Sequence, residues 1–287
     1  MLTCTLMGGL GNQLFQIFAT ISYAMKAQVS FGFLDVKTLG EGQGITIRHT
    51  YWNSIFHKLK PFLKNSFPQM NYVNENGFQF NSFNIQYFMQ NNVCLHGYFQ
   101  SYMYFQLCYS QIYNLLDIAK QKRDTIIKTT TINSLINEDF LSKTISLHFR
   151  MGDYKKIQHV HPIMTIQYYT RCLNFIQQQQ PNIKFNILYF CENEDLDDVE
   201  KIINQLSCSF KDYTFIRAPN LLEDWEQLLL MSCCSHNIIA NSSFSWWGAG
   251  FNSNKEKIVC YPSVWFGPSV GHNTSDLCPS GWNKIEA

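Results

Sequence analysis

Charged residues are scarce in this sequence, and positive charge is nowhere concentrated. Lysine, arginine, aspartate and glutamate make up 15% of the 287 residues, and the net charge is +1. Soluble proteins usually carry about a quarter of such residues. No run of lysine or arginine is longer than the pair Lys155-Lys156. Binding to duplex nucleic acid or to an anionic membrane needs a basic field, so we expect no nucleic-acid partner.

The ten cysteines form no CxxC pair, although most of them lie inside apolar runs. A zinc site needs closely spaced pairs of ligands, and secreted disulfide-rich domains are usually short and dense in cysteine. The metalloprotease motif HExxH does not occur either. The pattern favours buried free thiols in a reducing compartment.

Long hydrophobic runs are also missing. No uninterrupted stretch of about 20 apolar residues occurs, so the sequence predicts no transmembrane segment. The first 25 residues carry no charge, but glycines, Asn12 and Gln13 interrupt the stretch after Met7. A secretory signal would begin with a basic leader. We therefore expect a soluble, cytoplasmic protein, with peripheral membrane association as an alternative.

Strands and helices alternate through the second half of the chain. Apolar runs predict strands at 145–150, 185–191, 213–217, 236–241 and 257–263. Amphipathic patterns between them predict helices at 164–180, 194–206 and 222–235. Strands separated by helices of ten or more residues are typical of a parallel, doubly wound sheet.

The first half begins in the same way and then becomes harder to interpret. A strand at 2–7, a glycine turn and a helix at 14–27 are followed much later by a strand at 91–97 and a helix at 101–116, while 40–90 shows no clear order. The polar stretch 129–139 is the predicted linker. The sequence thus predicts an α/β protein with two Rossmann-like domains, 1–140 and 141–287, facing a central cleft. Ligands of such sheets bind at the carboxyl ends of the strands.

The first motif is the glycine-rich turn 8–13 between a predicted strand and a predicted helix. Glycines let a ligand approach the backbone closely, and the free N–H groups of a helix start attract anions. The spacing matches neither the dinucleotide nor the P-loop fingerprint. Gly9, Gly11, Asn12 and Gln13 are candidate ligand contacts, and a tight turn without a ligand is an equal alternative.

The second motif, HFRMGDY at 148–154, follows a predicted buried strand. His148 and Arg150 point to the same side of an alternating strand. The guanidinium of Arg150 can grip a diphosphate with two parallel hydrogen bonds. Asp153 can return to orient either side chain. The alternative is an Arg150–Asp153 ion pair that only ties the turn.

The third motif follows the strand at 236–241. Ser242 and Ser243 begin a helix with hydroxyl groups, and the next backbone amides form a cup the size of a phosphate. The candidate ligand contacts are Asn241, Ser242, Ser243, Phe244 and Ser245. Trp246 and Trp247 fit core positions better than stacking platforms.

The sequence Asp195-Leu196-Asp197 resembles the DxD with which many nucleotide-sugar enzymes hold a divalent metal. It lies in the first turn of a predicted helix, where acidic side chains favour the helix dipole. Solvated carboxylates that complement the dipole are the better interpretation, so we expect no metal site.

Four segments together resemble the alpha-1,2-fucosyltransferase family: GGLGNQLFQ near the N-terminus, HGYFQS at 96–101, HFRMGDY at 148–154 and LLLMSCCSHNIIANSSFSWWGA at 228–249. They occur in the order and spacing of that family and span nearly the whole chain. The HxRxGD pattern is shared with the wider fucosyltransferase superfamily. Members often have a second arginine where this chain has Met151, which puts a secondary phosphate contact in doubt.

The resemblance implies a GT-B-like fold, with residues 1–140 on the acceptor side and residues 141–287 binding GDP-fucose. It implies inverting transfer of L-fucose to the 2-hydroxyl of a galactose-containing glycan, without a metal or other cofactor. Arg150 would stabilise the leaving diphosphate, while Asp153 and His148 are candidates for a weak base or for orienting Arg150. The chain resembles soluble microbial or viral members. Another GDP-sugar transferase of the superfamily, or a glycan-binding protein without catalysis, are the alternatives.

Overall fold

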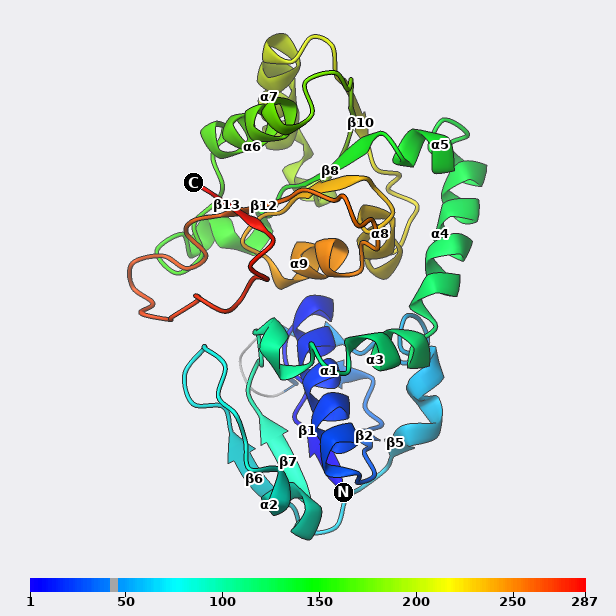
Figure 1. The fold of residues 1–287 in the computed structure, drawn as a ribbon, viewed down its shortest axis with the longest axis vertical. Helices are drawn as coiled ribbons and strands as arrows, with labels where there is room; N and C mark the ends of the chain where they lie inside the picture. The colour runs from blue at the N-terminus through cyan, green and yellow to red at the C-terminus, as the bar shows by residue number, and fades with distance from the viewer. Residues whose placement is uncertain (42–45) are drawn as a thin grey trace. The chain divides into compact units, whose positions relative to one another are not determined.

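The computed structural model describes residues 1–41 and 46–287, which form two compact units. Unit 1 comprises Met1–Ala119 and His272–Pro279, and unit 2 comprises Lys120–Gly271 and Ser280–Ala287 (Figure 1). Each unit has its own parallel sheet with helices packed on it. The expected GT-B-like α/β fold, with two Rossmann-like units, is therefore confirmed.

Unit 1 is built on three parallel strands in the order β1-β7-β6. They are β1 (Leu2–Cys4), β6 (Asn71–Asn74) and β7 (Val93–His96). The helix α1 (Leu10–Ala27) follows β1 after a short turn and buries most of its side chains. The predicted strand–turn–helix unit at the N-terminus is therefore confirmed.

Short elements complete unit 1. They are β2 (Phe33–Leu34), β3 (Thr38–Leu39), β4 (Arg48–His49), η1 (His57–Phe62), β5 (Leu63–Lys64), α2 (Ile85–Gln90), η2 (Tyr102–Tyr104) and α3 (Tyr109–Leu115). The single helix predicted at 101–116 is wrong, because the chain turns after η2 to bury two consecutive rings. Tyr104 packs on Tyr23 and Phe99, and Phe105 packs on the rings of α1.

Unit 2 contains a six-stranded sheet in the order β10-β9-β8-β11-β12-β13, and every neighbouring pair is parallel. Its strands are β8 (Thr144–His148), β9 (Asn186–Phe190), β10 (Thr214–Arg217), β11 (His236–Ile238), β12 (Val259–Pro262) and β13 (Asn283–Ile285). The doubly wound sheet predicted from the second half is confirmed. Sequence patterns missed only the short edge strand β13.

Helices cover both faces of this sheet (Figure 1). Residues of α6 (Ile166–Gln179) and α7 (Leu196–Ser209) share a core with Ile187 and Tyr189 of β9. Residues of α8 (Asp224–Met231) and α9 (Ser243–Gly250) pack on the opposite face with Leu188 and Phe190. The alternation along β9 follows from the two-residue period of a strand. Short η3 (Gly152–Lys156) and η4 (Asn193–Asp195) lie just after β8 and β9.

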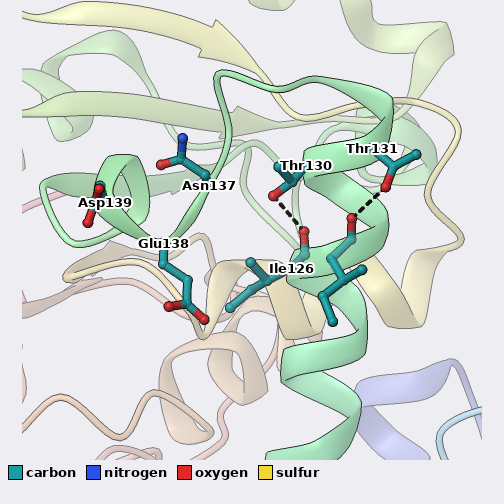
Figure 2. A pocket seen from close by; sticks show the side chains of 7 residues that line it. Ile126, Thr130, Thr131, Asn137, Glu138 and Asp139 are labelled. Carbon is teal, nitrogen blue, oxygen red and sulfur yellow. Dashed lines mark hydrogen bonds between the residues drawn. The ribbon is translucent and has the colours of Figure 1, made fainter.

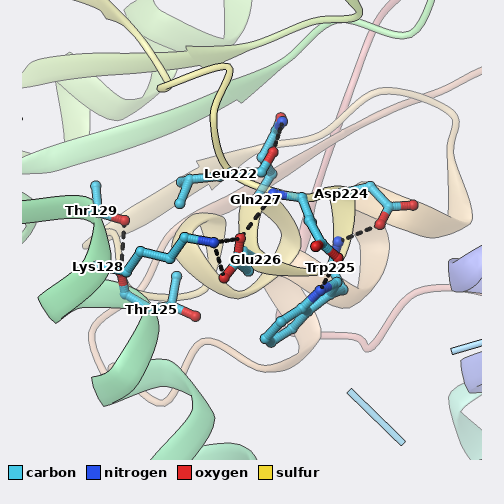
Figure 3. Close-up of polar contacts among 9 residues, drawn as sticks. Thr125, Lys128, Thr129, Leu222, Asp224, Trp225, Glu226 and Gln227 are labelled. Carbon is cyan, nitrogen blue, oxygen red and sulfur yellow. Dashed lines mark hydrogen bonds and ion pairs between the residues drawn. The ribbon is translucent and has the colours of Figure 1, made fainter. Parts of the chain in front are cut away.

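The predicted linker at 129–139 is wrong, because most of it is helical and packed on unit 2. The helix α4 runs from Ile118 to Ile132, and α5 spans Glu138–Leu141. Ile126 and Ile132 pack on the core beneath α8. Lys128 donates to both carboxylate oxygens of Glu226 at 2.7 and 2.6 Å (Figure 3). The boundary between the compact units is therefore at Ala119 rather than at residue 140.

All ten cysteines are free thiols, and seven are buried, as their apolar surroundings in the sequence suggested. Trp246 and Trp247 are also buried and belong to the core of unit 2. Within residues 1–41 and 46–287, no helix is both long and apolar enough to cross a membrane.

Candidate functional site

Arg150 lies at the carboxyl end of the central strand β8 and is held by two carboxylates. One terminal nitrogen donates to Asp153, three residues later in the same turn, and the other donates to Glu192, which follows β9. The Arg150 side chain is 17% exposed, whereas those of Asp153 and Glu192 are 49% and 52% exposed. The expected Arg150–Asp153 pair is present, and Glu192 is a partner that the sequence did not reveal.

Three rings in a row, Tyr154, His161 and Phe266 (the aromatic column), pack against the guanidinium. The carbon at the centre of the guanidinium lies 4.7 Å from the centre of the Tyr154 ring, within the range of a cation–π contact. Tyr154 stacks on His161 at 4.5 Å, and His161 contacts Phe266 at 5.4 Å. Burial opposes the charge, but Tyr154, Asp153 and Glu192 raise the pKa of Arg150 above its usual value, so the side chain stays cationic.

Gly152 allows this turn to form. Its φ of +34° is unusual for residues with a side chain, and a Cβ there would lie 2.8 Å from Oε2 of Glu192. The Gly152 N–H donates to Oδ2 of Asp195 at 2.7 Å. Any larger residue at this position would push Glu192 away from Arg150.

Asp195 has a structural role instead of the solvated one that we expected. It is 2% exposed, and its second oxygen pairs with Lys155 at 2.8 Å. Both oxygens therefore fasten η3 to the end of β9. Across the described part of the chain, no group of three or more histidine, cysteine, aspartate or glutamate side chains is placed to hold a metal ion. Metal-independent activity stays a prediction.

His148 is buried on the face of β8 that carries α9. Its ring lies 5.6 Å from Phe244, and burial together with the charge of Arg150 lowers the pKa of His148 to about 3. The imidazole is therefore neutral near pH 7. Its Nδ1 is buried, with no hydrogen-bond partner among the described residues. A neutral, buried ring of this kind is a poor proton acceptor.

The start of α9 lies next to this turn, because β11 pairs with β8. Ser242 is the N-cap, and its hydroxyl accepts from the Phe244 N–H at 3.3 Å. The Tyr154 hydroxyl donates to the Asn241 carbonyl at 3.3 Å, which joins the Arg150 turn to the start of α9. Ser243 is the first residue of the helix. A helix therefore begins at Ser243 with Ser242 as its cap, as predicted, and phosphate binding at this helix N-terminus stays a prediction.

Two predicted contact residues in this segment instead hold the backbone in place. The Asn241 amide is buried and donates to the carbonyls of Pro162 and Trp265, both at 3.0 Å. The Ser245 hydroxyl is buried and donates to the Ser242 carbonyl at 3.4 Å. Their side chains therefore position the helix start, while its N–H groups are what a ligand would meet.

Two lysines satisfy the other end of α9. Lys122 donates to the carbonyls of Ser232 and Phe251, and Lys257 donates to those of Ala249 and Asn252. Cations at a helix C-terminus complement its dipole. Burial and nearby Lys122 lower the pKa of Lys257 to about 8. Both lysines fix the helix whose N-terminus faces the site.

The glycine turn of unit 1 has an inward-facing network. Gly8 has a φ of +74°, Gly9 is the N-cap of α1, and Gly11 is buried within the helix. The Gln13 amide is fully buried and donates to the carbonyls of Gly8 and His49 at 3.0 and 2.9 Å. Asn12 accepts from the Gln100 amide at 2.9 Å. The predicted ligand contacts of this turn stay predictions.

The HGYFQS segment follows β7 at the same edge of the unit 1 sheet. One oxygen of Glu75 accepts from the N–H groups of Tyr98 and Phe99, both at 2.8 Å. Burial raises the pKa of Glu75, and the charge of Asp276 adds to the effect. Asp276 in turn accepts from the Phe80 N–H at 2.5 Å. These carboxylates hold backbone loops.

A surface depression of about 530 Å³ lies between the end of α4 and α5 (Figure 2). Its lining includes Ile127, Thr130 and Glu138, and none of the predicted site residues contributes to it. The hydroxyls of Thr130 and Thr131 are bonded to carbonyls of their own helix. The chemistry-bearing groups of unit 2 instead gather at the carboxyl edge of its sheet.

Comparison with known proteins places this arrangement in a family. A model described as glycosyl transferase family 11 matches residues 1–285. The chain belongs to glycosyl transferase family 11. The resemblance seen in its four motifs is confirmed at this level, and the protein is a glycosyltransferase.

Two curated relatives of this family 11 protein come from Escherichia coli. An alpha-1,2-colitosyltransferase is 28% identical over 98% of this chain and 97% of its own length. The O-antigen biosynthesis glycosyltransferase WbnK is 30% identical, over 69% of this chain and 62% of WbnK.

Two solved structures are similar over most of the family 11 chain. One is a mutant of Arabidopsis thaliana FUT1 in complex with GDP, with a TM-score of 0.49 and 9% identity over 90% of this chain and 69% of that one. The other is a glycosyl transferase family 9 protein from Veillonella parvula, with a TM-score of 0.49 and 11% identity over 100% and 86%.

The sequence of this family 11 protein gave little sign of two features of the site. Glu192 follows a predicted strand, where a polar residue is common, but its pairing with Arg150 bridges 42 positions. Phe266 lies in a long loop after β12 and reaches the column through His161. Parallel neighbours β8 and β9 bring their ends together, so the order of strands was the signal that could have identified Glu192.

Proposed function

We propose that this family 11 protein transfers L-fucose from GDP-fucose to the 2-hydroxyl of a galactose-type acceptor, with inversion at the fucose C1. The main support is one juxtaposition in unit 2. Arg150 and the N-terminus of α9 follow neighbouring parallel strands, and the Tyr154 hydroxyl links them. A guanidinium beside the N-terminus of a helix suits a diphosphate.

The reaction needs charge stabilisation at the leaving group. As the bond from C1 to the diphosphate breaks, negative charge grows on the diphosphate oxygens. Arg150 and the backbone N–H groups at the start of α9 would meet that charge in fixed positions, which is an effective form of catalysis. These groups would do the work that a divalent cation does in DxD enzymes. In support, both oxygens of Asp195 are already bonded to Gly152 and Lys155.

The roles of the two candidate bases follow from their surroundings. Asp153 is paired with Arg150, and His148 is neutral and buried with a pKa of about 3. We assign both to orienting Arg150. The acceptor oxygen bonds to C1 from the face opposite the diphosphate, the bond from C1 to the diphosphate breaks, GDP departs and the proton of the acceptor hydroxyl passes to solvent. An early break of the bond to the diphosphate leaves little need for a strong base. We assign donor binding to unit 2 and acceptor binding to unit 1.

A second donor deserves an equal test, because the relative that matches 98% of this chain is named for colitose transfer. Colitose is the 3-deoxy form of L-fucose, so the two donors share the GDP portion that the site in unit 2 would bind. A pocket that bonds the fucose 3-hydroxyl would strongly disfavour the sugar that lacks it.

The experiment is a donor panel of GDP-fucose, GDP-colitose and GDP-mannose with galactoside acceptors, in the presence of EDTA. We expect transfer from GDP-fucose and an alpha-1,2 bond in the product by NMR. Activity that needs added manganese would contradict the metal-independent mechanism. Preference for another donor or linkage would move the protein to a different branch of the superfamily, and glycan binding without release of GDP would show a protein without catalysis.

A further inference from the structure

The pairing of Arg150 conflicts with diphosphate binding as it stands. Its two terminal nitrogens are occupied by Asp153 and Glu192, so one positive charge faces two negative ones. A diphosphate is itself an anion, and a bidentate grip on one edge of the guanidinium competes with the carboxylate that lies on that edge.

Glu192 is the carboxylate that can leave. Asp153 belongs to the same tight turn as Arg150, and its backbone is fixed by η3. Glu192 comes from the neighbouring strand end, is 52% exposed, and lies in the space that Gly152 leaves open. The adjoining Asn193 and Glu194 are exposed as well.

The surroundings also determine in which direction a nucleotide can extend. On the side of β12, the column of Tyr154, His161 and Phe266 occupies the sheet edge. The loop after β12 packs tightly there, since the Gly267 N–H donates to the Val160 carbonyl at 2.8 Å. On the side of β9, the edge presents Glu192. A nucleotide with its diphosphate on α9 and Arg150 therefore extends toward Glu192.

We propose that Glu192 leaves Arg150 when the diphosphate binds and then accepts hydrogen bonds from the ribose hydroxyls of the donor nucleotide. This rests on the proposed function, since it presumes a nucleoside diphosphate donor. A carboxylate at the end of the second strand holds ribose hydroxyls in other doubly wound sheets, where the diphosphate lies on a helix N-terminus. Here the carboxylate follows β9, on one side of β8, and the helix N-terminus is that of α9, which follows β11 on the other side of β8.

Calorimetric titration with GDP and with 2′,3′-dideoxy-GDP tests this directly. In the wild type, loss of both hydroxyls should weaken binding by about tenfold or more, as expected for hydrogen bonds to a charged group. In Glu192→Ala, the two nucleotides should bind with nearly equal affinity, whether the affinity for GDP itself rises or falls. Asp153→Ala is the matched control, because it removes the other carboxylate of Arg150 and should preserve the wild-type ratio.

The ratio of the two dissociation constants, for 2′,3′-dideoxy-GDP and for GDP, separates the possible outcomes. An unchanged ratio in Glu192→Ala, or a wild-type ratio near one, would overturn the assignment of Glu192 while leaving GDP binding intact. If the wild type binds no GDP at all, the proposed function fails together with this inference. Melting temperatures near that of the wild type should accompany both variants, because the two side chains are about half exposed.

Discussion

The carboxyl edges of the two sheets use polar side chains in opposite ways. In unit 1, Gln13 and Glu75 are bonded to backbone carbonyl and N–H groups. In unit 2, Arg150, Asp153 and Glu192 are bonded to each other, and both carboxylates are about half exposed. The first arrangement fixes loops, whereas the second can be rearranged by a charged ligand.

The comparison shows why similar local patterns predict different chemistry. Each edge has a strand, a turn with a positive-φ glycine, and a helix start nearby. The edge of unit 2 adds a cation, Arg150, whose partners are side chains. A charged side chain that is paired with other side chains can exchange one of them for a substrate. A charged side chain that is bonded to the backbone cannot leave its partners without moving a loop.

The largest effect expected outside Arg150 is on the stability of unit 1. Glu75→Ala removes the acceptor of the Tyr98 and Phe99 N–H groups and should cost about 2 kcal/mol of the free energy of unfolding. Donor affinity should stay unchanged, because the donor groups lie in unit 2. Chemical denaturation and GDP titration of this variant measure both quantities. A large loss of GDP affinity in well-folded protein would break the comparison.

A second prediction concerns the pH dependence of stability in unit 2. The pKa of His148 is lowered to about 3 by burial and by Arg150, so the folded protein resists its protonation. The unfolded chain binds that proton near pH 6.5. The contribution of His148 to stability should therefore be complete above about pH 6.5, and this histidine alone should lower stability by about 1.4 kcal/mol for each pH unit below it, toward pH 3.

The matched comparison for this effect is a second buried histidine. Burial lowers the pKa of His236 to about 4, so it contributes in the same direction. His148→Gln should reduce the slope of stability against pH between about 6 and 4 by roughly half, leaving the share of His236. Urea denaturation at several pH values measures the slope. An unchanged slope would show that His148 is charged in the folded protein.

The smallest effect concerns the support of Arg150 by Tyr154. Tyr154→Leu removes the ring beneath the guanidinium and should raise the donor KM about fivefold, equivalent to about 1 kcal/mol. Tyr154→Phe keeps the ring and removes the hydroxyl that donates to Asn241, so its KM should stay within about threefold of wild type. Equal losses in both variants would mean that the hydroxyl, and not the ring, is what positions the site.

Sequence patterns predicted the sheet of unit 2 well because local and tertiary preferences agree there. Each predicted strand is a short apolar run, and all but the edge strand β10 lie largely buried between helices. The three motifs fell at strand ends for the same reason. Ser242 could be assigned as a helix cap from the sequence, since capping depends on neighbouring residues alone.

Predictions from the sequence failed where contacts between residues far apart in the chain determine the structure. The stretch around Thr129 is polar, but its hydroxyl bonds back to Thr125 and the helix is held by contacts to α8. Asp195 has the sequence of a solvated helix start, yet Lys155 and Gly152 reach it from another strand end. The site of unit 2 could be predicted in its backbone, in Arg150 and in its pairing with Asp153, but not in the pairing with Glu192.

The central claim is that Arg150 stabilises the leaving diphosphate, and kcat per folded molecule of Arg150→Ala tests it most directly. We expect a loss of about 10²–10³-fold, or roughly 3–4 kcal/mol, with a melting temperature near wild type. Arg150→Lys should recover little, since it keeps the charge but lacks the planar fork. Arg171→Ala, which removes a surface arginine paired with Glu286, is the control and should be fully active. An Arg150→Ala protein that melts early but turns over normally would contradict the account, because Arg150 would then only tie the turn.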